Sequence, residues 1–164
     1  MIKVGIITAS DKGSRGERED KSAPVIKDMA RQIGGEVIHY VIVPDEQTEL
    51  VRSMKYCADV LKLDLVFTTG GTGMSPRDIT PEATMSIVER LVPGIPEAMR
   101  MRSLAVTDRA MLSRAVAGIR AETLIINLPG SPKAVKECLD VILPPLKHGI
   151  EILRGDTGEC GSNI

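Results

Sequence analysis

A glycine-rich turn between an apolar run and a helix start is the feature that most limits how this chain can fold. Leu65-Val66-Phe67 has the composition of a buried strand, and the residues from Thr68 to Pro81 read Thr-Thr-Gly-Gly-Thr-Gly-Met-Ser-Pro-Arg-Asp-Ile-Thr-Pro. Thr80-Pro81 predicts a helix start, since a hydroxyl residue before proline is typical of that position. A strand that opens through such a turn into a helix is a common way to hold a phosphate group.

The turn differs from the two familiar nucleotide-binding loops. A Walker loop requires a lysine after its last glycine, and none is present here. A dinucleotide-binding fingerprint requires a third glycine where this chain has Pro76. The turn carries a carboxylate instead, Asp78, which favours a phosphate-bearing ligand handled together with a metal ion. The alternative is a tight connection without a ligand, because glycine is also the usual residue of sharp turns.

Segments with strand-like and helix-like apolar spacing alternate along the rest of the chain. Strands are predicted at residues 4–9, 36–43, 64–69, 116–120 and 123–127, with a long loop at 10–23. Helices are predicted at 24–33, 48–63, 81–90, 96–105 and 131–153, the last interrupted at Pro144-Pro145. This alternation predicts a three-layer α/β/α sandwich with a mostly parallel central sheet and a short antiparallel edge. We expect one domain over residues 1–154 and a flexible tail over 155–164.

Four loops should meet beyond the carboxyl ends of the parallel strands, where ligands bind in sheets of this kind. They are Ser10-Asp11, Pro44-Asp45, the glycine turn, and the segment from Asn127 to Ser131. Backbone N–H groups and hydroxyls of the glycine turn can approach phosphate oxygens there. The residues of the turn with groups suited to this task are Thr69, Gly70, Gly71, Thr72, Gly73 and Ser75.

Two aspartates, Asp45 and Asp78, follow predicted strands at this same edge. Carboxylates beside a phosphate repel it unless a cation lies between them, and Mg²⁺ binds the oxygens of both groups. We therefore predict that Asp45 and Asp78 are metal ligands. Asp often forms turns, so a purely structural role is the alternative for either residue taken alone.

Two further segments offer groups that could bind anions. Ser131-Pro132 predicts a second helix start, and Lys133 in its first turn is electrostatically unfavourable unless an anion lies nearby. Arg114, which follows Ser113, could hold a phosphate or carboxylate with two parallel hydrogen bonds. The alternative for both cations is a side chain directed into solvent.

Composition excludes several classes of function. Aromatic residues make up only 2% of the 164 residues, which is too few for a platform that stacks single-stranded nucleic acid. The 21 basic and 22 acidic residues leave a net charge of −1 and predict no surface for polyanions. No apolar run approaches the roughly 18 residues of a membrane span. Three well-separated cysteines predict a reduced, cytoplasmic protein.

Together these motifs resemble the molybdopterin-binding family, which includes the molybdopterin adenylyltransferases (MogA type) and the MoaB proteins. The resemblance covers roughly residues 3–154. It rests on Thr-Thr-Gly-Gly-Thr-Gly at 68–73, Arg-Asp-Ile-Thr-Pro-Glu-Ala-Thr at 77–84, Pro-Asp-Glu at 44–46, Leu-Ser-Arg at 112–114 and Asn-Leu-Pro-Gly-Ser-Pro at 127–132. The opening loop also matches at Ser10-Asp11 and at 20–24, with Ala23 where many relatives carry glycine.

The resemblance implies a reaction in which the terminal phosphate of molybdopterin takes AMP from ATP, with Mg²⁺ required and pyrophosphate released. It implies Asp45 and Asp78 as the catalytic carboxylates, a homotrimer, and hand-over of the product to a molybdate-insertion protein. The residues that would contact nucleotide or pterin are Ser10, Asp11, Thr69, Gly70, Gly71, Thr72, Gly73, Ser75, Ser113, Arg114, Pro129, Gly130, Ser131 and Lys133. The alternatives are a non-catalytic molybdopterin carrier of the same family and, outside it, a regulator that binds a nucleotide or phosphosugar.

Overall fold

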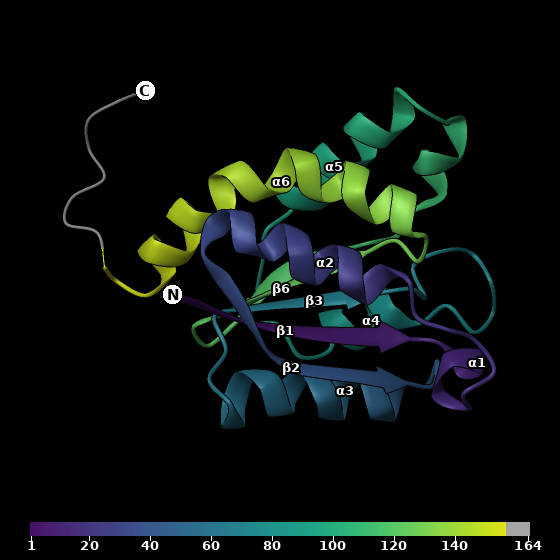
Figure 1. The fold of residues 1–164 in the computed structure, drawn as a ribbon, viewed down its shortest axis with the longest axis horizontal. Helices are drawn as coiled ribbons and strands as arrows, with labels where there is room; N and C mark the ends of the chain where they lie inside the picture. Colours follow the sequence, from purple (N-terminus) through teal and green to yellow (C-terminus); the bar gives the residue numbers. More distant parts are fainter. Residues whose placement is uncertain (157–164) are drawn as a thin grey trace.

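A six-stranded sheet forms the centre of the computed structural model, which describes residues 1–156 (Figure 1). Its strand order is β2-β1-β3-β6-β5-β4. The strands are β1 (Ile2–Ala9), β2 (Gly35–Val43), β3 (Leu65–Thr69), β4 (Arg90–Leu91), β5 (Ala117–Arg120) and β6 (Thr123–Leu128). Most of the predicted tail, residues 157–164, lies outside the described residues.

The sheet is mostly parallel, as predicted. Strands β2, β1, β3 and β6 run parallel, and β5 and β4 form an antiparallel edge beside β6. Every residue of β3 and β6 is buried, which is the pattern expected of parallel strands covered on both faces. The continuous apolar runs that predicted these strands are therefore the middle layer of the sandwich.

Helices cover both faces of the sheet (Figure 1). One core packs α2, α5 and α6 against the sheet, and a second core packs α3 and α4 against the other face. The helices are α1 (Asp11–Ser14), α2 (Ser22–Ala30), α3 (Gln47–Lys55), α4 (Thr80–Met85), α5 (Gly94–Leu104) and α6 (Pro132–Leu153). Shorter helical turns are η1 (Arg31–Ile33), η2 (Tyr56–Val60) and η3 (Asp108–Leu112).

Three predicted segments differ from the structure. The predicted helix at 81–90 ends at Met85, because Glu89 and Val92 donate backbone hydrogen bonds to β5 and continue the sheet as β4. Helix α6 continues through Pro144-Pro145, with buried apolar residues on both sides of the prolines holding it against the sheet. The predicted loop at 10–23 contains α1, whose first turn is capped by the Ser10 hydroxyl.

The two ends of the described chain are fastened together at the amino-terminal edge of the parallel strands. Arg154, which follows α6, donates hydrogen bonds to the Asp64 carboxylate at 2.7 Å and to the Met1 carbonyl at 3.1 Å. The backbone N–H of Lys3 donates to the same carboxylate at 2.6 Å. Burial raises the pKa of Asp64, but these hydrogen bonds outweigh it and lower the pKa overall. No helix among the described residues has the length and apolar character needed to cross a membrane.

Candidate functional site

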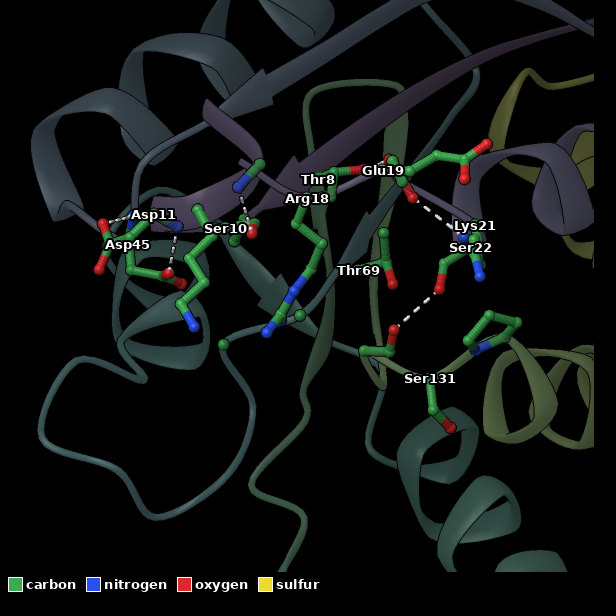
Figure 2. A pocket seen from close by; sticks show the side chains of 18 of the residues that line it. Thr8, Ser10, Asp11, Arg18, Glu19, Lys21, Ser22, Asp45, Thr69 and Ser131 are labelled. Carbon is green, nitrogen blue, oxygen red and sulfur yellow. Dashed lines mark hydrogen bonds between the residues drawn. The ribbon is translucent and has the colours of Figure 1, made fainter. Parts of the chain in front are cut away.

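A cavity of about 770 Å³ lies beyond the carboxyl ends of the parallel strands (Figure 2). The loops that follow β1, β2, β3 and β6 all contribute to its wall, which is the convergence expected at this edge of a parallel sheet. The residues of the sequence-based site that line it are Ser10, Asp11, Asp45, Thr69, Gly70, Gly71, Asp78, Gly130 and Ser131.

A second cavity, of about 280 Å³, contacts the same glycine turn further along the chain. Its wall includes four residues of the sequence-based site: Thr72, Gly73, Ser113 and Pro129. Apolar side chains such as Met99 and Leu112 form much of the remainder. Ser75, Arg114 and Lys133 line neither cavity. The glycine turn therefore runs between a highly charged cavity and a less polar one.

Gly70 and Gly71 have backbone conformations and neighbours that exclude a side chain. Both have positive φ angles, 90° and 68°. A Cβ on Gly70 would lie 2.5 Å from the carbonyl oxygen of Ala9, and one on Gly71 would lie 2.4 Å from Thr80 Oγ1 and 3.1 Å from Asp45 Oδ1. The missing side chains thus let β1, α4 and Asp45 close around the turn.

Thr80 does not cap its helix, contrary to the prediction. It lies inside α4, fully buried, and its hydroxyl donates to the carbonyl of Gly70 at 3.0 Å. The hydrogen bond is possible because Gly71 leaves room for the hydroxyl. The predicted cap at Ser131 is confirmed, since its hydroxyl accepts from the Ala134 N–H at 3.2 Å. Lys133, in the same first turn, is exposed.

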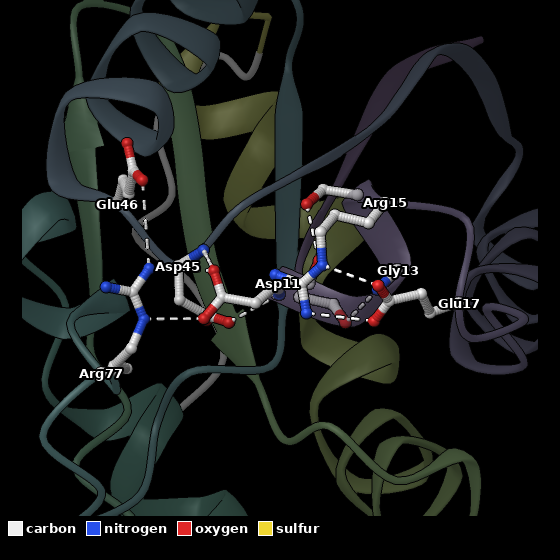
Figure 3. Close-up of polar contacts among 9 residues, drawn as sticks. Asp11, Gly13, Arg15, Glu17, Asp45, Glu46 and Arg77 are labelled. Carbon is white, nitrogen blue, oxygen red and sulfur yellow. Dashed lines mark hydrogen bonds and ion pairs between the residues drawn. The ribbon is translucent and has the colours of Figure 1, made fainter.

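Asp11 and Asp45 hold each other through reciprocal hydrogen bonds (Figure 3). The backbone N–H of each residue donates to the carboxylate of the other at 3.0 Å. Arg77 also donates to both oxygens of Asp11, at 2.7 and 2.9 Å, and this hydrogen bonding lowers the pKa of Asp11. Through these hydrogen bonds Asp11 helps to hold Asp45 in place, and its predicted contact with substrate stays a prediction.

Asp45 and Asp78, called the acidic pair below, are two of the five acidic residues that line the first cavity. Burial raises the pKa of Asp45, and the negative charges of Asp11 and Asp78 raise it further. Asp78 accepts a hydrogen bond from the Ser75 N–H at 3.0 Å and donates its own N–H to the Ser75 carbonyl at 2.9 Å. Gly73 makes room for this closed turn, since a Cβ there would lie 2.9 Å from Asp78 Oδ2.

The acidic pair suits Mg²⁺ better than a metal held by protein groups alone. Within residues 1–156, no three His, Cys, Asp or Glu side chains are grouped to hold a metal ion. Mg²⁺ in phosphoryl-transfer sites is usually bound by one or two carboxylates, with waters and substrate phosphates completing the shell. Burial and the nearby charges of Asp11 and Asp78 raise the pKa of Asp45 and so disfavour its ionised form, an effect that a bound cation would offset.

Asp20 holds the opening loop against the sheet. Its carboxylate accepts hydrogen bonds from the Thr8 hydroxyl at 2.5 Å, the Tyr40 hydroxyl at 2.8 Å, and the N–H groups of Ser22 and Ala23. Burial raises the pKa of Asp20, but these four hydrogen bonds outweigh it and lower the pKa overall.

Two hydroxyls then fix the loop after β6. The Ser22 hydroxyl donates to the Gly130 carbonyl at 2.8 Å, and Thr69 Oγ1 donates to the Pro129 carbonyl at 2.6 Å. Asp20 thereby anchors Ser22, whose hydroxyl joins the opening loop to Gly130 in the wall of the first cavity.

Asp45 and Asp20 should make the stability of the fold depend on pH in opposite directions. The pKa of Asp45 is higher in the folded than in the unfolded state. Between these two pKa values the folded state binds more protons, so stability falls as pH rises through that range. We expect Asp45→Asn to remove this penalty and to melt about 2 °C higher than the wild type near pH 8. The advantage should vanish near pH 3, below the ordinary carboxyl pKa. Differential scanning calorimetry at both pH values measures the difference.

Asp20→Asn is the matched control with the opposite expectation. The folded pKa of Asp20 lies below its unfolded value, so its stabilising effect is present above the unfolded pKa and is lost as pH falls through the folded one. We expect a loss of about 2 kcal/mol near pH 8, because charge-assisted hydrogen bonds are lost, and a smaller loss in acid. A uniform change in both variants at both pH values would contradict this account.

Three cations in the first cavity are absent from the sequence-based site. Lys12, Arg18 and Lys21 come from α1 and the opening loop and line the cavity wall. In Figure 2 the side chain of Arg18 extends between Asp45 and Thr69. None of the three forms a salt bridge with another residue in 1–156. The sequence does not single them out, because they alternate with acidic residues as in an ordinary solvent-exposed loop.

Comparison with known proteins places this geometry in a family. The model of a probable molybdopterin binding domain matches residues 5–148. The molybdopterin adenylyltransferase of Helicobacter pylori strain J99 is 42% identical over 157 residues, which cover 94% of this chain and 89% of that protein. The gephyrin of Dictyostelium discoideum is 45% identical over 160 residues, covering 92% of this chain and 22% of gephyrin.

Solved structures agree with the sequence comparison. The crystal structure of the molybdopterin biosynthesis enzyme MoaB from Thermus thermophilus superposes with a TM-score of 0.90 at 48% identity, covering 94% of this chain and 98% of that one. The chain belongs to the molybdopterin-binding family of the MogA and MoaB proteins.

Proposed function

We propose that this protein is a molybdopterin adenylyltransferase of molybdenum cofactor biosynthesis. It would transfer AMP from ATP to the terminal phosphate of molybdopterin, giving adenylyl-molybdopterin and pyrophosphate. The observation that carries the proposal is the pair Asp45 and Asp78 beside a glycine turn that has no lysine and separates two cavities. The name of the Helicobacter pylori relative supports the same activity.

The two cavities suit two different substrates. The first combines three cations with five acidic residues, among them Asp45 and Asp78, which fits a triphosphate only when a divalent metal ion accompanies it. The second has apolar side chains and few charges, which fits the pterin ring system. With ATP in the first cavity and the pterin in the second, the phosphates of both substrates would meet at the glycine turn.

The reaction then depends mainly on alignment. An oxygen of the molybdopterin phosphate attacks the α-phosphorus of ATP, and the bond from that phosphorus to the oxygen that bridges to the β-phosphate breaks. The backbone N–H groups of residues 71–73 would orient the phosphates, since that of Gly70 already donates to the Leu128 carbonyl, and Lys12, Arg18 and Lys21 would neutralise the departing pyrophosphate. Positioning of two bound reactants can supply a large part of such a rate enhancement.

Asp45 and Asp78 would hold the Mg²⁺ that we propose as cofactor. When bound, Mg²⁺ would neutralise phosphate charge that a Walker lysine neutralises in other folds. Asp11 and Arg77 keep Asp45 in place for this task, and Ser75 keeps Asp78 in place. Both carboxylates must be ionised to bind a metal. Because the pKa of Asp45 is raised, we expect activity to fall as the pH is lowered and Asp45 takes up a proton.

The test is ATP-dependent release of pyrophosphate in the presence of molybdopterin and Mg²⁺. We expect release to require all three components. The competing function is a molybdopterin carrier without enzymatic activity, which the same loops would allow. Calorimetry that shows tight pterin binding but no ATP binding, together with no pyrophosphate release, would establish the carrier instead.

Assembly, location and downstream partner are further parts of the proposal. We propose a homotrimer in the cytoplasm that hands its product to a molybdate-insertion protein. Cys57 and Cys138 are free thiols buried in the core, as expected in a reducing compartment. Light scattering of the purified protein measures the oligomer, and a mass other than three chains would contradict the trimer. A tungsten-inserting partner would serve the same chemistry, because the metal enters after adenylylation.

A further inference from the structure

Arg114 makes an unusual set of contacts with the backbone of the glycine turn. Its own N–H donates to the Thr72 carbonyl at 2.9 Å. Its guanidinium donates from Nε to the Gly73 carbonyl at 2.7 Å and from Nη2 to the Asp78 carbonyl at 2.6 Å. Nη1 also donates to the carboxylate of Glu82, in the first turn of α4. One side chain therefore contacts both ends of the segment from Gly73 to Asp78.

These contacts leave Arg114 poorly suited to bind a substrate phosphate. A guanidinium has five N–H groups, and four of them have acceptors here. Glu82 neutralises the positive charge, and its own pKa is lowered by the hydrogen bond from Arg114. Arg114 also lines neither cavity. The anion-binding role predicted for it from the sequence is therefore replaced by contacts within the protein.

The position of Arg114 is itself fixed by its chain neighbours. Arg100, in α5, donates to the carbonyls of Ser113 and Ala115 at 3.3 and 3.0 Å. Ala115 is buried in the core that packs α5 and α6 against the sheet. Arg114 is thus anchored to one layer of the fold and extends its planar fork to the turn that carries Asp78.

The segment from Gly73 to Asp78 is closed by its own hydrogen bonds between Ser75 and Asp78. Those bonds set the shape of the segment but not its place relative to the sheet. We propose that Arg114 is a positioning residue that sets the place of the Asp78 carboxylate without touching either substrate. The proposal rests on the adenylyltransferase function, for which Asp78 must reach the metal and phosphates at the first cavity.

Arg114→Lys tests the proposal, because lysine keeps the charge beside Glu82 but cannot bridge two carbonyls with a rigid fork. We expect kcat to fall about 10²-fold, the cost typical of a displacement of about 1 Å at a reacting centre. The KM values for ATP and molybdopterin should stay within about twofold of the wild type, since no substrate contact is removed. Steady-state pyrophosphate release at varied substrate concentrations separates the two quantities.

Arg120→Lys is the matched control. Arg120 makes the same kind of contacts, donating to both oxygens of Asp59 at 2.9 and 2.7 Å and to the Ile87 carbonyl at 2.9 Å. It pairs with Thr123 at the start of β6, at the sheet edge opposite the cavities. We expect similar melting temperatures for the two lysine variants and a large loss of kcat only for Arg114→Lys.

Hydrogen exchange of the amides of Ser75 and Asp78 gives a readout that needs no activity. Both should exchange at least about tenfold faster in Arg114→Lys than in the wild type or in Arg120→Lys, because a segment no longer held at Gly73 and Asp78 opens its Ser75–Asp78 hydrogen bonds more often. Unchanged kcat and exchange, or an equal loss in both variants, would overturn the positioning role. A raised KM with unchanged kcat would overturn it in favour of direct substrate binding. If the wild type releases no pyrophosphate but the exchange difference appears, the proposed function fails while the positioning of the turn stands.

Discussion

Asp78→Asn should lower the rate of pyrophosphate release by about 10³-fold while the protein stays folded. The substitution removes the negative charge that would bind Mg²⁺ at the first cavity. It keeps the shape of the side chain, so the asparagine oxygen can still accept the hydrogen bond from the Ser75 N–H. The Arg114 contacts also survive, because they reach the carbonyl of residue 78 and not its side chain. Pyrophosphate release at saturating ATP, molybdopterin and Mg²⁺ measures the effect.

Asp140→Asn is the control for the loss of one carboxylate. Asp140 lies in α6, exposed, and pairs only with Lys136 at 2.9 Å among the residues described. Its replacement should leave activity within about twofold and stability within about 0.5 kcal/mol. Undiminished pyrophosphate release from Asp78→Asn would remove the central argument for a metal site at this turn.

Gly70→Ala should destabilise the fold by about 3 kcal/mol and abolish activity. Part of the cost comes from the positive φ angle, which an L-residue adopts at an expense of about 1–2 kcal/mol. The remainder comes from the Cβ, which would meet the Ala9 carbonyl oxygen at 2.5 Å. This neighbour is backbone of β1 and cannot rotate away, so the ends of β1 and β3 must separate. Chemical denaturation measures the stability change.

Gly34→Ala separates the two contributions. Gly34 has a similar positive φ angle of 74°, but no atom lies within 4 Å of the position that its Cβ would occupy. It follows η1 at the opposite edge of the sheet from the cavities. We expect a loss of about 1 kcal/mol with full activity. Equal effects of the two substitutions would show that backbone conformation alone, and not the close approach of β1, requires Gly70.

The sheet was largely predictable because its middle strands are buried on both faces. Continuous apolar runs such as 4–9 and 123–127 have few alternative structures, and each observed strand extends its predicted range by one or two residues at one end only. The edge was less predictable. The predicted helix at 81–90 ends early, and only the presence of β5 beside its second half favours a strand there. Long-range pairing of that kind leaves no local signal.

The sequence was enough to predict where the site lies, but not the role of each residue in it. Parallel topology brings the loops of Asp45, Asp78 and Gly130 to one edge, and their presence around one cavity follows from strand order. Whether a polar group faces a ligand or another protein group depends on contacts far apart in the sequence. Arg114 could donate to a phosphate or to backbone carbonyls, and Asp11 could accept from a ligand or from protein N–H groups; only the fold shows that protein groups engage both side chains.

The contact of Arg154 with Asp64 and Met1 also affects how this domain can be combined with others. Because both ends of the described chain meet at the edge of the sheet opposite the cavities, a partner domain tethered to residue 1 would leave the catalytic loops open. A tether of suitable length would also hold a product-consuming domain at a high effective concentration. The position of these two ends therefore allows a fusion at residue 1 that leaves the first cavity uncovered.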